Sequence, residues 1–425
     1  MTATNQLQAV IDRIQPLQDE VVRQADDHLN QLTKPPGSLG KLEDIARQLA
    51  GITGEVMPVF EKKAVIVMAG DHGVCEEGIS AFPAEVTPQM VLNFLAGGAA
   101  VNVMARHAGA DVVCVDMGVN ADLEHPALLS RKVRKGTRNM AKEAALTPEE
   151  TLQAVLAGVE VVDDLVAQGY RLFATGEMGI GNTTSSAAIL CALTGLDAGV
   201  AVGRGTGIDD AKWLHKMNVV NRVLDLHGLR GASGEKSGMG SEVSDEKSGK
   251  VGGEVSDEKS GEMSDGKSGM MSGGKSDEIS DEISDEMGGK LGDEVSDGKS
   301  SMMSGRALEV LEKAGGLEIA GLVGVILGAA QHRCPVVIDG FISSAAALVA
   351  SRLAPLSASY MLASHLSQEQ GHAKLLEAIG LSAMLHMDMR LGEGSGAVLA
   401  FPMIEAAGKI MKEMATFESA GVSRE

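Results

Sequence analysis

The chain has 425 residues, of which 44% are hydrophobic and only 2% aromatic, and its formal net charge is −21. This length suffices for two or three domains with a sizeable core, which must consist mainly of aliphatic side chains and the 23 methionines. The acidic balance argues against a nucleic-acid partner, because such a protein needs a basic face. A small anionic ligand is not excluded, since local Lys, Arg and backbone amides decide its binding.

Nothing in the sequence indicates secretion or a membrane. The N-terminal twenty residues lack a basic segment followed by an apolar one, so no signal peptide is apparent. No uninterrupted apolar run reaches membrane-spanning length. The cysteines show no CxxC spacing, as expected for reduced, mostly buried thiols in a cytoplasmic protein. They are Cys75, Cys114, Cys191 and Cys334.

Strand-like segments alternate along the chain with helix-like ones. Apolar, β-rich runs predict strands at 64–70, 111–119, 171–181, 198–205, 335–341 and 357–365. Ala- and Leu-rich runs predict helices at 182–195, 342–354 and 397–407. Because the strands are unbroken apolar runs that alternate with helices, they favour a mostly parallel sheet covered on both faces. The predicted fold class is therefore α/β, with a mostly parallel, doubly wound (Rossmann-like) sheet.

The segment 232–305 differs from the rest of the chain. It repeats SDEKSG-like and SDEIS-like units and holds 18 acidic residues against 8 lysines, a net charge of −10. Such a tract buries too little apolar surface to offset its ordering entropy, so we expect a disordered, solvated insertion. Its scattered Met, Ile and Val leave the alternative of a segment that orders on a partner.

Polar and glycine residues gather at the carboxyl ends of the predicted strands, where ligands bind in parallel α/β sheets. They are Asp71, His72, Asp116, Glu177, Asn182, the run 203–206 and Asp339. This clustering is the main sign of an active site. Asp71 and His72 lack a metal-ligand spacing, and we expect no metal.

The run RLGEGSG at 390–396 places one carboxylate, Glu393, between Gly392 and Gly394 and before a predicted helix. Glycine reaches backbone angles that other residues avoid and lets a ligand approach closely. A lone carboxylate there can act on a substrate as acid, base or ligand. A solvated turn that contains a Glu explains the same residues.

Two further glycine-rich loops allow two readings. GEMGIGNTT at 176–184 passes from strand to helix, with Asn182 or Thr183 able to cap the helix and glycines freeing backbone amides. This arrangement suits a phosphate, and a tight structural turn uses the same residues. GRGTGIDD at 203–210 adds the charge of Arg204. Neither loop matches the Walker pattern, and no GxGxxG opens a first βαβ unit.

Several motifs occur in an order that resembles a known family. They are KPPGSLGKLE (34–43), DHGVCEEGISAFPAEVT (71–87), GEMGIGNTT (176–184), GRGTGIDD (203–210), DGFISSAAAL (339–348), SHLSQEQG (364–371) and MRLGEGSGA (389–397). Together they resemble the nicotinate-nucleotide–dimethylbenzimidazole phosphoribosyltransferases. The resemblance spans nearly the whole chain except the insertion.

This resemblance implies an activity and a domain plan. Family members transfer the phosphoribosyl group of nicotinate mononucleotide to 5,6-dimethylbenzimidazole, with no cofactor, and form homodimers. Their α/β domain carries a smaller helical domain made from both chain ends. The implied division is 1–60 (helical), 61–231 (α/β), 232–305 (insertion), 306–375 (α/β) and 376–425 (catalytic loop and C-terminal helical part).

The resemblance also implies site residues. Glu393 matches the family's general base, and Glu177 matches a second carboxylate near the reacting centre. Phe82, Met178 and Leu391 would wall the benzimidazole pocket, with Gln89 close by. The positions that match phosphate or ribose contacts are Gly179, Asn182, Thr183, Gly203, Lys216 and Ser367, and Asp339 and Gly340 belong to the same cleft.

Two other classes of function remain as alternatives. A non-catalytic nucleotide-binding module would keep the glycine loops but could dispense with Glu393. A nicotinamide-dependent oxidoreductase is disfavoured, since the dinucleotide fingerprint is missing near the first strand. The pocket residues leave the preferred base open among benzimidazoles, purines and phenols.

Overall fold

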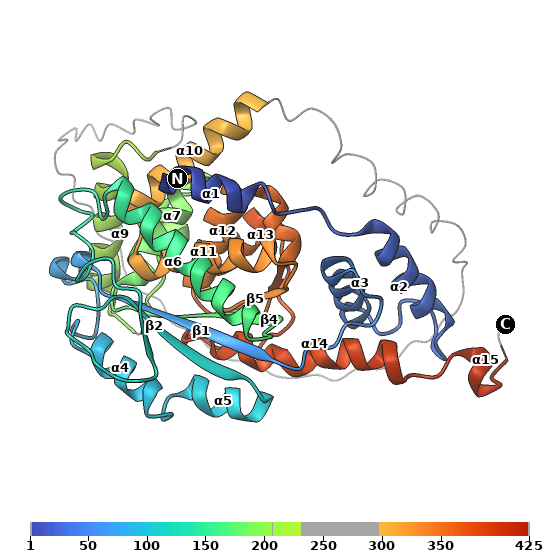
Figure 1. Ribbon diagram of the computed structural model, residues 1–425. Helices are drawn as coiled ribbons and strands as arrows, with labels where there is room; N and C mark the ends of the chain where they lie inside the picture. Colours follow the sequence, from blue (N-terminus) through green and yellow to red (C-terminus); the bar gives the residue numbers. More distant parts are fainter. Residues whose placement is uncertain (1, 206, 231–296, 424–425) are drawn as a thin grey trace, which may run out of the picture. The chain divides into compact units, whose positions relative to one another are not determined.

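The computed structural model describes residues 2–205, 207–230 and 297–423 (Figure 1). Within this set, residues 2–230 and 298–423 belong to one compact unit. Residues 231–296, which include most of the predicted insertion (232–305), lie outside the described residues.

A parallel sheet of six strands forms the centre of this unit, in the order β3-β2-β1-β4-β5-β6. The strands are β1 (Lys63–Gly70), β2 (Asp111–Gly118), β3 (Leu128–Ser130), β4 (Leu172–Met178), β5 (Val336–Ile338) and β6 (Met361–Ala363). Every pair of neighbours in the sheet is parallel. The central strands β1 and β4 are buried along their whole length, which explains their unbroken apolar sequences. The predicted fold class is confirmed.

Helices cover both faces of the sheet, and successive residues of β1 show the two sides. Ile66 and Met68 belong to one core, and Val65 and Val67 to the other, because side chains alternate across a strand. Helices of the first core include α6 (Pro148–Ala167), α7 (Asn182–Thr194), α9 (Asp210–Leu226), α10 (Asp297–Ala314), α11 (Leu317–Gln331), α12 (Phe341–Leu353) and α13 (His372–Ile379). Helices of the second include α4 (Val86–Leu95), α5 (Ala100–Ala108) and α14 (Ser395–Glu413).

Helices from the two ends of the chain pack together. In Figure 1 the long α14 extends beyond the sheet toward α2 (Asp19–Gln31) and α3 (Lys41–Thr53), and α2 and α3 share the second core with it. The Thr33 N–H donates to the Ala415 carbonyl oxygen at 3.0 Å. The first helix, α1 (Ala3–Ile11), differs from the expected division, since its apolar side chains join the core that contains α6 and α11.

Two predictions need correction, and one strand was missed. The apolar run 198–205 is not a strand: it holds the short helix α8 (Ala198–Ala201), which the Asp197 carboxylate caps by accepting the Gly199 N–H, and then a loop. The edge strand β3 was not predicted, because its three residues carry too little pattern. The predicted disorder is wrong for 297–305, since α10 already begins at Asp297. A formed helix extends at little cost into residues that would not nucleate one.

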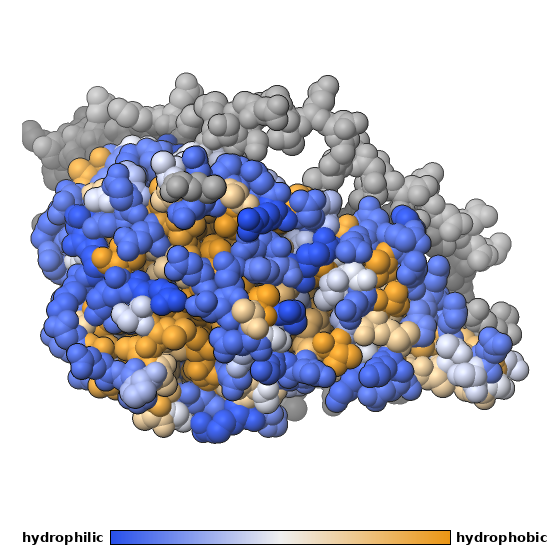
Figure 2. Space-filling model, viewed as in Figure 1, coloured by the Kyte–Doolittle hydropathy of each residue, from blue (hydrophilic) through white to orange (hydrophobic). Residues whose placement is uncertain are grey.

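The remaining short elements connect the larger ones. They are the 3-10 helices η1 (Gly73–Glu77) and η2 (Pro355–Tyr360) and the C-terminal α15 (Phe417–Ala420). Among the described residues, no helix is long and apolar enough to cross a membrane. Hydrophilic residues cover much of the face in Figure 2, with apolar residues in smaller groups between them.

Candidate active site

A cavity of about 360 Å³ opens at the carboxyl ends of the strands and brings together most of the predicted site residues. Its walls come from the end of β4, the start of α7, the loops before α4 and α9, the start of α12 and the segment 390–393. The predicted residues that line it are Phe82, Glu177, Met178, Gly179, Asn182, Thr183, Lys216, Gly340, Ser367, Leu391 and Glu393.

Three predicted residues do not line this cavity. Gln89 is exposed on α4, next to Met90, which does line it. Gly203 is buried behind Glu369, and Asp339 is 1% exposed behind the loop that carries Glu393.

The strand-end residues Asp71, His72 and Asp116 do not line the cavity either. His72 instead forms a fully buried ion pair with Glu318, with Nε2 2.5 Å from Oε1. The pair lies beneath Gly179 of the strand-to-helix turn. The prediction that these residues reach the cavity is therefore wrong: the His72–Glu318 pair packs against Gly179, and the Asp116 carboxylate pairs with the Lys132 ammonium at 3.0 Å.

Three further charged residues line the cavity. Sequence analysis had pointed to Arg204 through its glycine-rich loop, but it had not assigned Glu369 or Arg390 to the site. The Arg390 guanidinium donates to the Gly205 carbonyl oxygen at 3.2 Å and so joins the two glycine-rich segments. Arg390 lies in the glycine-rich run that also holds Glu393, so charge inside that run was the available signal; Glu369 lies in SHLSQEQG, where only the resemblance to the family could have indicated it.

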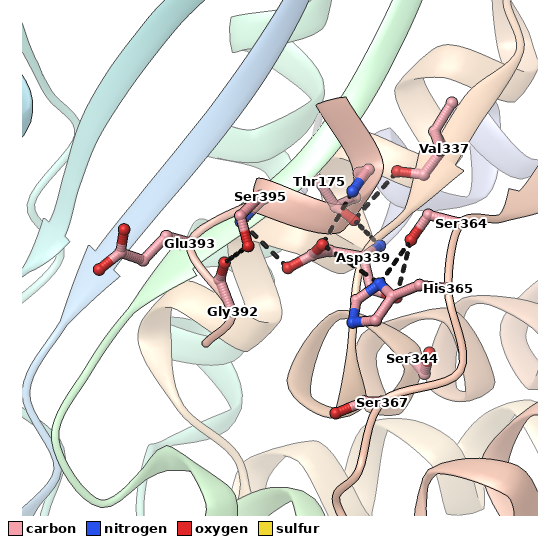
Figure 3. Close-up of polar contacts among 12 residues, drawn as sticks. Thr175, Val337, Asp339, Ser344, Ser364, His365, Ser367, Gly392, Glu393 and Ser395 are labelled. Carbon is pink, nitrogen blue, oxygen red and sulfur yellow. Dashed lines mark hydrogen bonds and ion pairs between the residues drawn. The ribbon is translucent and has the colours of Figure 1, made fainter. Parts of the chain in front are cut away.

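The segment that carries Glu393 has an unusual backbone. Gly392, Glu393 and Gly394 all have positive φ, at 83°, 64° and 86°. This conformation is unfavourable for a residue with a Cβ and is common for glycine. Gly394 is the N-cap of α14, so Glu393 directly precedes a helix N-terminus, as predicted. The Ser395 hydroxyl donates to the Gly392 carbonyl oxygen at 2.7 Å and closes the turn (Figure 3).

Close approach to β4 explains the glycines of this segment. A Cβ on Gly392 would lie closer than 3.0 Å to Glu177 Oε1, and one on Gly176 would lie 2.7 Å from the Glu393 carbonyl oxygen. The Glu393 N–H donates to Glu177 Oε1 at 3.4 Å. Because Gly176 and Gly392 have no side chain, the segment that carries Glu393 lies directly against the end of β4, and Glu393 and Glu177 become neighbours.

Both carboxyl groups have raised pKa values. Burial raises the pKa of Glu393 to about 7, and the charge of Asp339 adds to the effect. Burial likewise raises the pKa of Glu177 to about 8, with Asp339 and Glu318 adding and the Asn182 amide opposing. Glu393 Oε2 is buried and has no hydrogen-bond partner among the described residues. A carboxyl group with such a pKa and a free oxygen suits proton transfer near neutral pH.

A cation and hydroxyl groups lie at another part of the cavity. The Lys216 ammonium, on α9, donates to the Thr183 hydroxyl at 2.8 Å, and its burial lowers its pKa to about 8. Neither Asn182 nor Thr183 caps α7, contrary to the prediction: Gly181 is the N-cap, and no side chain caps it. The Asn182 amide donates instead to Glu177 Oε2. The uncapped N-terminus of α7 and Lys216 together favour an anion.

Apolar side chains form the other end of the cavity. Phe82 and Leu391 are 49% and 55% exposed, unusual for such side chains, and Met178 and Met90 line the same space. An apolar ligand group would remove this surface from water. The cavity therefore suits two ligand groups, one apolar and one anionic, with the Glu393 carboxyl group among them.

The fold and this cavity define an α/β enzyme that binds its ligands at the carboxyl ends of a parallel sheet. A family model described as "Phosphoribosyltransferase" matches residues 14–242 and 294–422. The chain belongs to the nicotinate-nucleotide–dimethylbenzimidazole phosphoribosyltransferase family.

Relatives with that name cover nearly the whole chain. The protein of Chloroflexus aggregans is 44% identical over 418 residues, and that of a Geobacter species is 43% identical over 418 residues. The first alignment covers 98% of both chains, and the second covers 98% of this chain and 99% of the relative. The crystal structure of CobT from Thermus thermophilus is similar with a TM-score of 0.75 and 40% identity, covering 96% of this chain and 100% of that one.

Proposed function

We propose that this chain transfers the phosphoribosyl group of nicotinate mononucleotide to 5,6-dimethylbenzimidazole or a related base. The products are α-ribazole 5′-phosphate, for the cobalamin lower ligand, and nicotinate. The observation that carries the proposal is Glu393, a carboxyl group with a pKa of about 7 and an unpartnered oxygen in a cavity with apolar and anion-binding parts. The names of the relatives point to the same reaction.

In the proposed mechanism Glu393 is the general base. One ring nitrogen of the benzimidazole attacks C1′ of the ribose while Glu393 accepts the proton from the other ring nitrogen. The bond from C1′ to the nicotinate nitrogen breaks, and its electron pair stays on nicotinate. A positioned base contributes about 10²- to 10⁴-fold to such a step. The pyridinium ring is already a cationic leaving group, so the protein needs no acid to assist its departure.

Glu177 acts beside the reacting centre. Its raised pKa keeps it protonated in the empty site at neutral pH. A cationic pyridinium ring would lower the pKa values of Glu177 and Glu393, since an opposite charge favours the ionised form. Substrate binding therefore generates the carboxylate that stabilises positive charge on the ribose.

The other predicted residues divide between the two ligand groups. Lys216 and Thr183 bind the phosphate together with the amide groups of the α7 turn, which Gly179 exposes. Ser367 and Asn182 lie at the ribose, and Gly203 gives space to Glu369. The benzimidazole binds against Phe82, Met178 and Leu391, with Gln89 and Gly340 at its margins.

Mass spectrometry tests the reaction directly. The protein is incubated with nicotinate mononucleotide and dimethylbenzimidazole, and α-ribazole 5′-phosphate is the expected product. Tight nucleotide binding without turnover would contradict the proposal and support a binding module. An absorbance change linked to NAD(P)H would support an oxidoreductase. An equimolar panel of bases in the same assay identifies the preferred acceptor.

We further propose that the chain acts as a homodimer in the cytoplasm and that its terminal helices form the smaller domain implied by the family. The packing of α2 and α3 with α14 supports the second point. Light scattering at micromolar concentration should give twice the 44.0 kDa chain mass. A monomeric mass would contradict the dimer.

A further inference from the structure

We propose that Asp339 is a positioning residue for the base: its carboxylate holds the segment 392–394 in the conformation that presents Glu393 to the cavity. This inference rests on the proposed function. Asp339 does not line the cavity, so it acts through the loop rather than on a ligand. Sequence analysis had expected it to lie in the ligand cleft.

Two hydrogen bonds connect Asp339 to the loop and to the helix that follows. Asp339 Oδ2 accepts the Gly394 N–H at 3.0 Å, and Oδ1 accepts the Ala397 N–H at 2.9 Å. These amides lie at the N-terminus of α14, where backbone N–H groups have no partner within the helix. Asp339, which directly follows β5, therefore caps α14 and fixes Gly394, the residue after Glu393, together with the first turn of the helix (Figure 3).

Asp339 is itself held by neighbouring strands. Its N–H donates to the Thr175 hydroxyl oxygen at 3.1 Å, and that hydroxyl donates to the Val337 carbonyl oxygen at 3.2 Å. The Ser364 hydroxyl donates to the Asp339 carbonyl oxygen at 3.4 Å. Figure 3 shows these contacts between β4, β5 and the segment after β6. The carboxylate therefore has a rigid base from which to fix the loop.

His365 packs beside the carboxylate. Its Nδ1 lies 3.9 Å from Asp339 Oδ1, and its side chain is 2% exposed. A Cβ on Gly396 would overlap the imidazole ring, and one on Gly340 would lie 3.6 Å from it. The ring thus fits between two glycines, and it fixes the distance between β5 and the first turn of α14.

The strained backbone of Glu393 explains why such a support is needed. An L-residue in the left-handed region brings its Cβ close to the following carbonyl oxygen, so it occurs where surrounding contacts impose it. Asp339 supplies one such contact at Gly394, next to Glu393, and a second at Ala397 in the first turn of α14. Without them the loop has an easier conformation, in which the carboxyl group leaves its place.

The charge of Asp339 allows a second measurement, the pH dependence of the rate. The charged groups around Glu393 are Glu177 from β4, Asp339 from β5, His365 after β6 and Arg390 in the same loop. Of these, Asp339 raises the pKa of Glu393. Removing the charge of Asp339 should therefore lower the pKa of Glu393, and the acidic limb of the rate profile should move to lower pH.

The test compares Asp339→Asn, Glu393→Gln and the double variant in the α-ribazole phosphate assay. We expect Asp339→Asn to reduce kcat about 10²-fold, because a misplacement of about 1 Å costs that much. KM for nicotinate mononucleotide should change less than about threefold, since the nucleotide contacts are retained. In the Glu393→Gln background the same change should cost less than about twofold more, because the base is already absent.

Asp116→Asn is the matched control. Asp116 is also a buried carboxylate near the end of a strand, and its Oδ1 accepts the Val119 N–H at 2.9 Å, away from the cavity. Both variants should lower the melting temperature, but only Asp339→Asn should move the acidic limb.

Other outcomes overturn the inference. Additive losses in the double variant, or an unmoved limb with reduced kcat, would assign Asp339 a purely structural role. Wild-type kcat in Asp339→Asn would exclude the role altogether. Absence of product from the wild-type protein would instead contradict the proposed function. If Asp339→Asn does not fold, His365→Gln provides the second test: it disturbs the packing beside the Asp339 carboxylate and should reduce kcat, whereas wild-type kcat would overturn the inference.

Discussion

Replacing Gly392 by Ala tests whether close contact between the loop and β4 creates the active site. The added Cβ would lie closer than 3.0 Å to Glu177 Oε1, a distance at which something must move. Glu177 is poorly placed to move, since the Asn182 amide holds its other oxygen and its side chain is buried. We therefore expect the loop to shift and Glu393 to shift with it.

The magnitude has two parts. Gly392 has a φ of 83°, and a Cβ in this region costs about 1–2 kcal/mol of stability. That strain acts on folding and by itself leaves the rate of the folded enzyme unchanged. The shift of Glu393 acts on turnover, and a displacement of about 1 Å should reduce kcat about 10²-fold, equivalent to about 2.7 kcal/mol of activation free energy.

Gly380→Ala separates these two parts. Gly380 has nearly the same φ, 84°, at the end of α13, but a Cβ there would meet nothing within 4 Å. Both variants should lose stability in thermal unfolding, Gly392→Ala by at least as much as Gly380→Ala because of its contact with Glu177, and only Gly392→Ala should lose turnover in the α-ribazole phosphate assay. Equal kcat in the two variants would refute the reasoning, whether both are fully active or both impaired.

Four further predictions follow from the same geometry. Glu393→Gln should reduce turnover about 10²-fold or more while nucleotide binding by calorimetry survives; near-normal turnover would remove it from the mechanism. The pKa of Glu177 rises from an ordinary 4.5 to about 8, so the folded state binds more protons than the unfolded one between these values, and stability falls as pH rises through that window. Glu177→Gln should therefore melt higher than the parent at pH 8.5 but not at pH 4.5, and equal melting at both would contradict the raised pKa. Lys216→Met should raise KM for nicotinate mononucleotide about ten- to a hundredfold, as expected for a lost charge-assisted bond, and an unchanged KM would place the phosphate elsewhere. Splicing Gly231 to Arg306 through a short linker removes the start of α10 as well as the insertion, yet it should keep kcat within about twofold, because the Arg306 guanidinium donates to the Leu229 carbonyl oxygen at 2.7 Å and so holds the two ends of the splice together; soluble, folded but inactive protein would refute this.

Unbroken apolar runs and the Ala- and Leu-rich segments between them predicted much of the fold. The buried strands β1, β2 and β4 and the helices α7 and α12 follow their predicted segments closely, since long apolar runs ending in glycine leave few alternatives. Short elements escaped prediction. The run 198–205 looks like a strand by composition, but the Asp197 cap and the packing of α8 on α7 decide in favour of a helix.

Local sequence singled out Glu393, because glycines on both sides allow unusual backbone angles and a close approach, but it left a solvated turn open, and the resemblance to the family was what implied a base. Local sequence could not show which residues lie close to Glu393 in the folded chain. In space Glu393 lies next to Glu177, which is 216 residues earlier in the chain. Asp339 is also close, since its carboxylate accepts the N–H of Gly394, 55 residues later in the chain. The raised pKa of Glu393, near 7, comes from burial and from the charge of Asp339, and both exist only once β4, β5 and α14 meet. The sequence, through its ordered family motifs, thus pointed to Glu393 as the candidate base. The tertiary structure decided its position and its pKa, because burial and charge act through space and not along the chain.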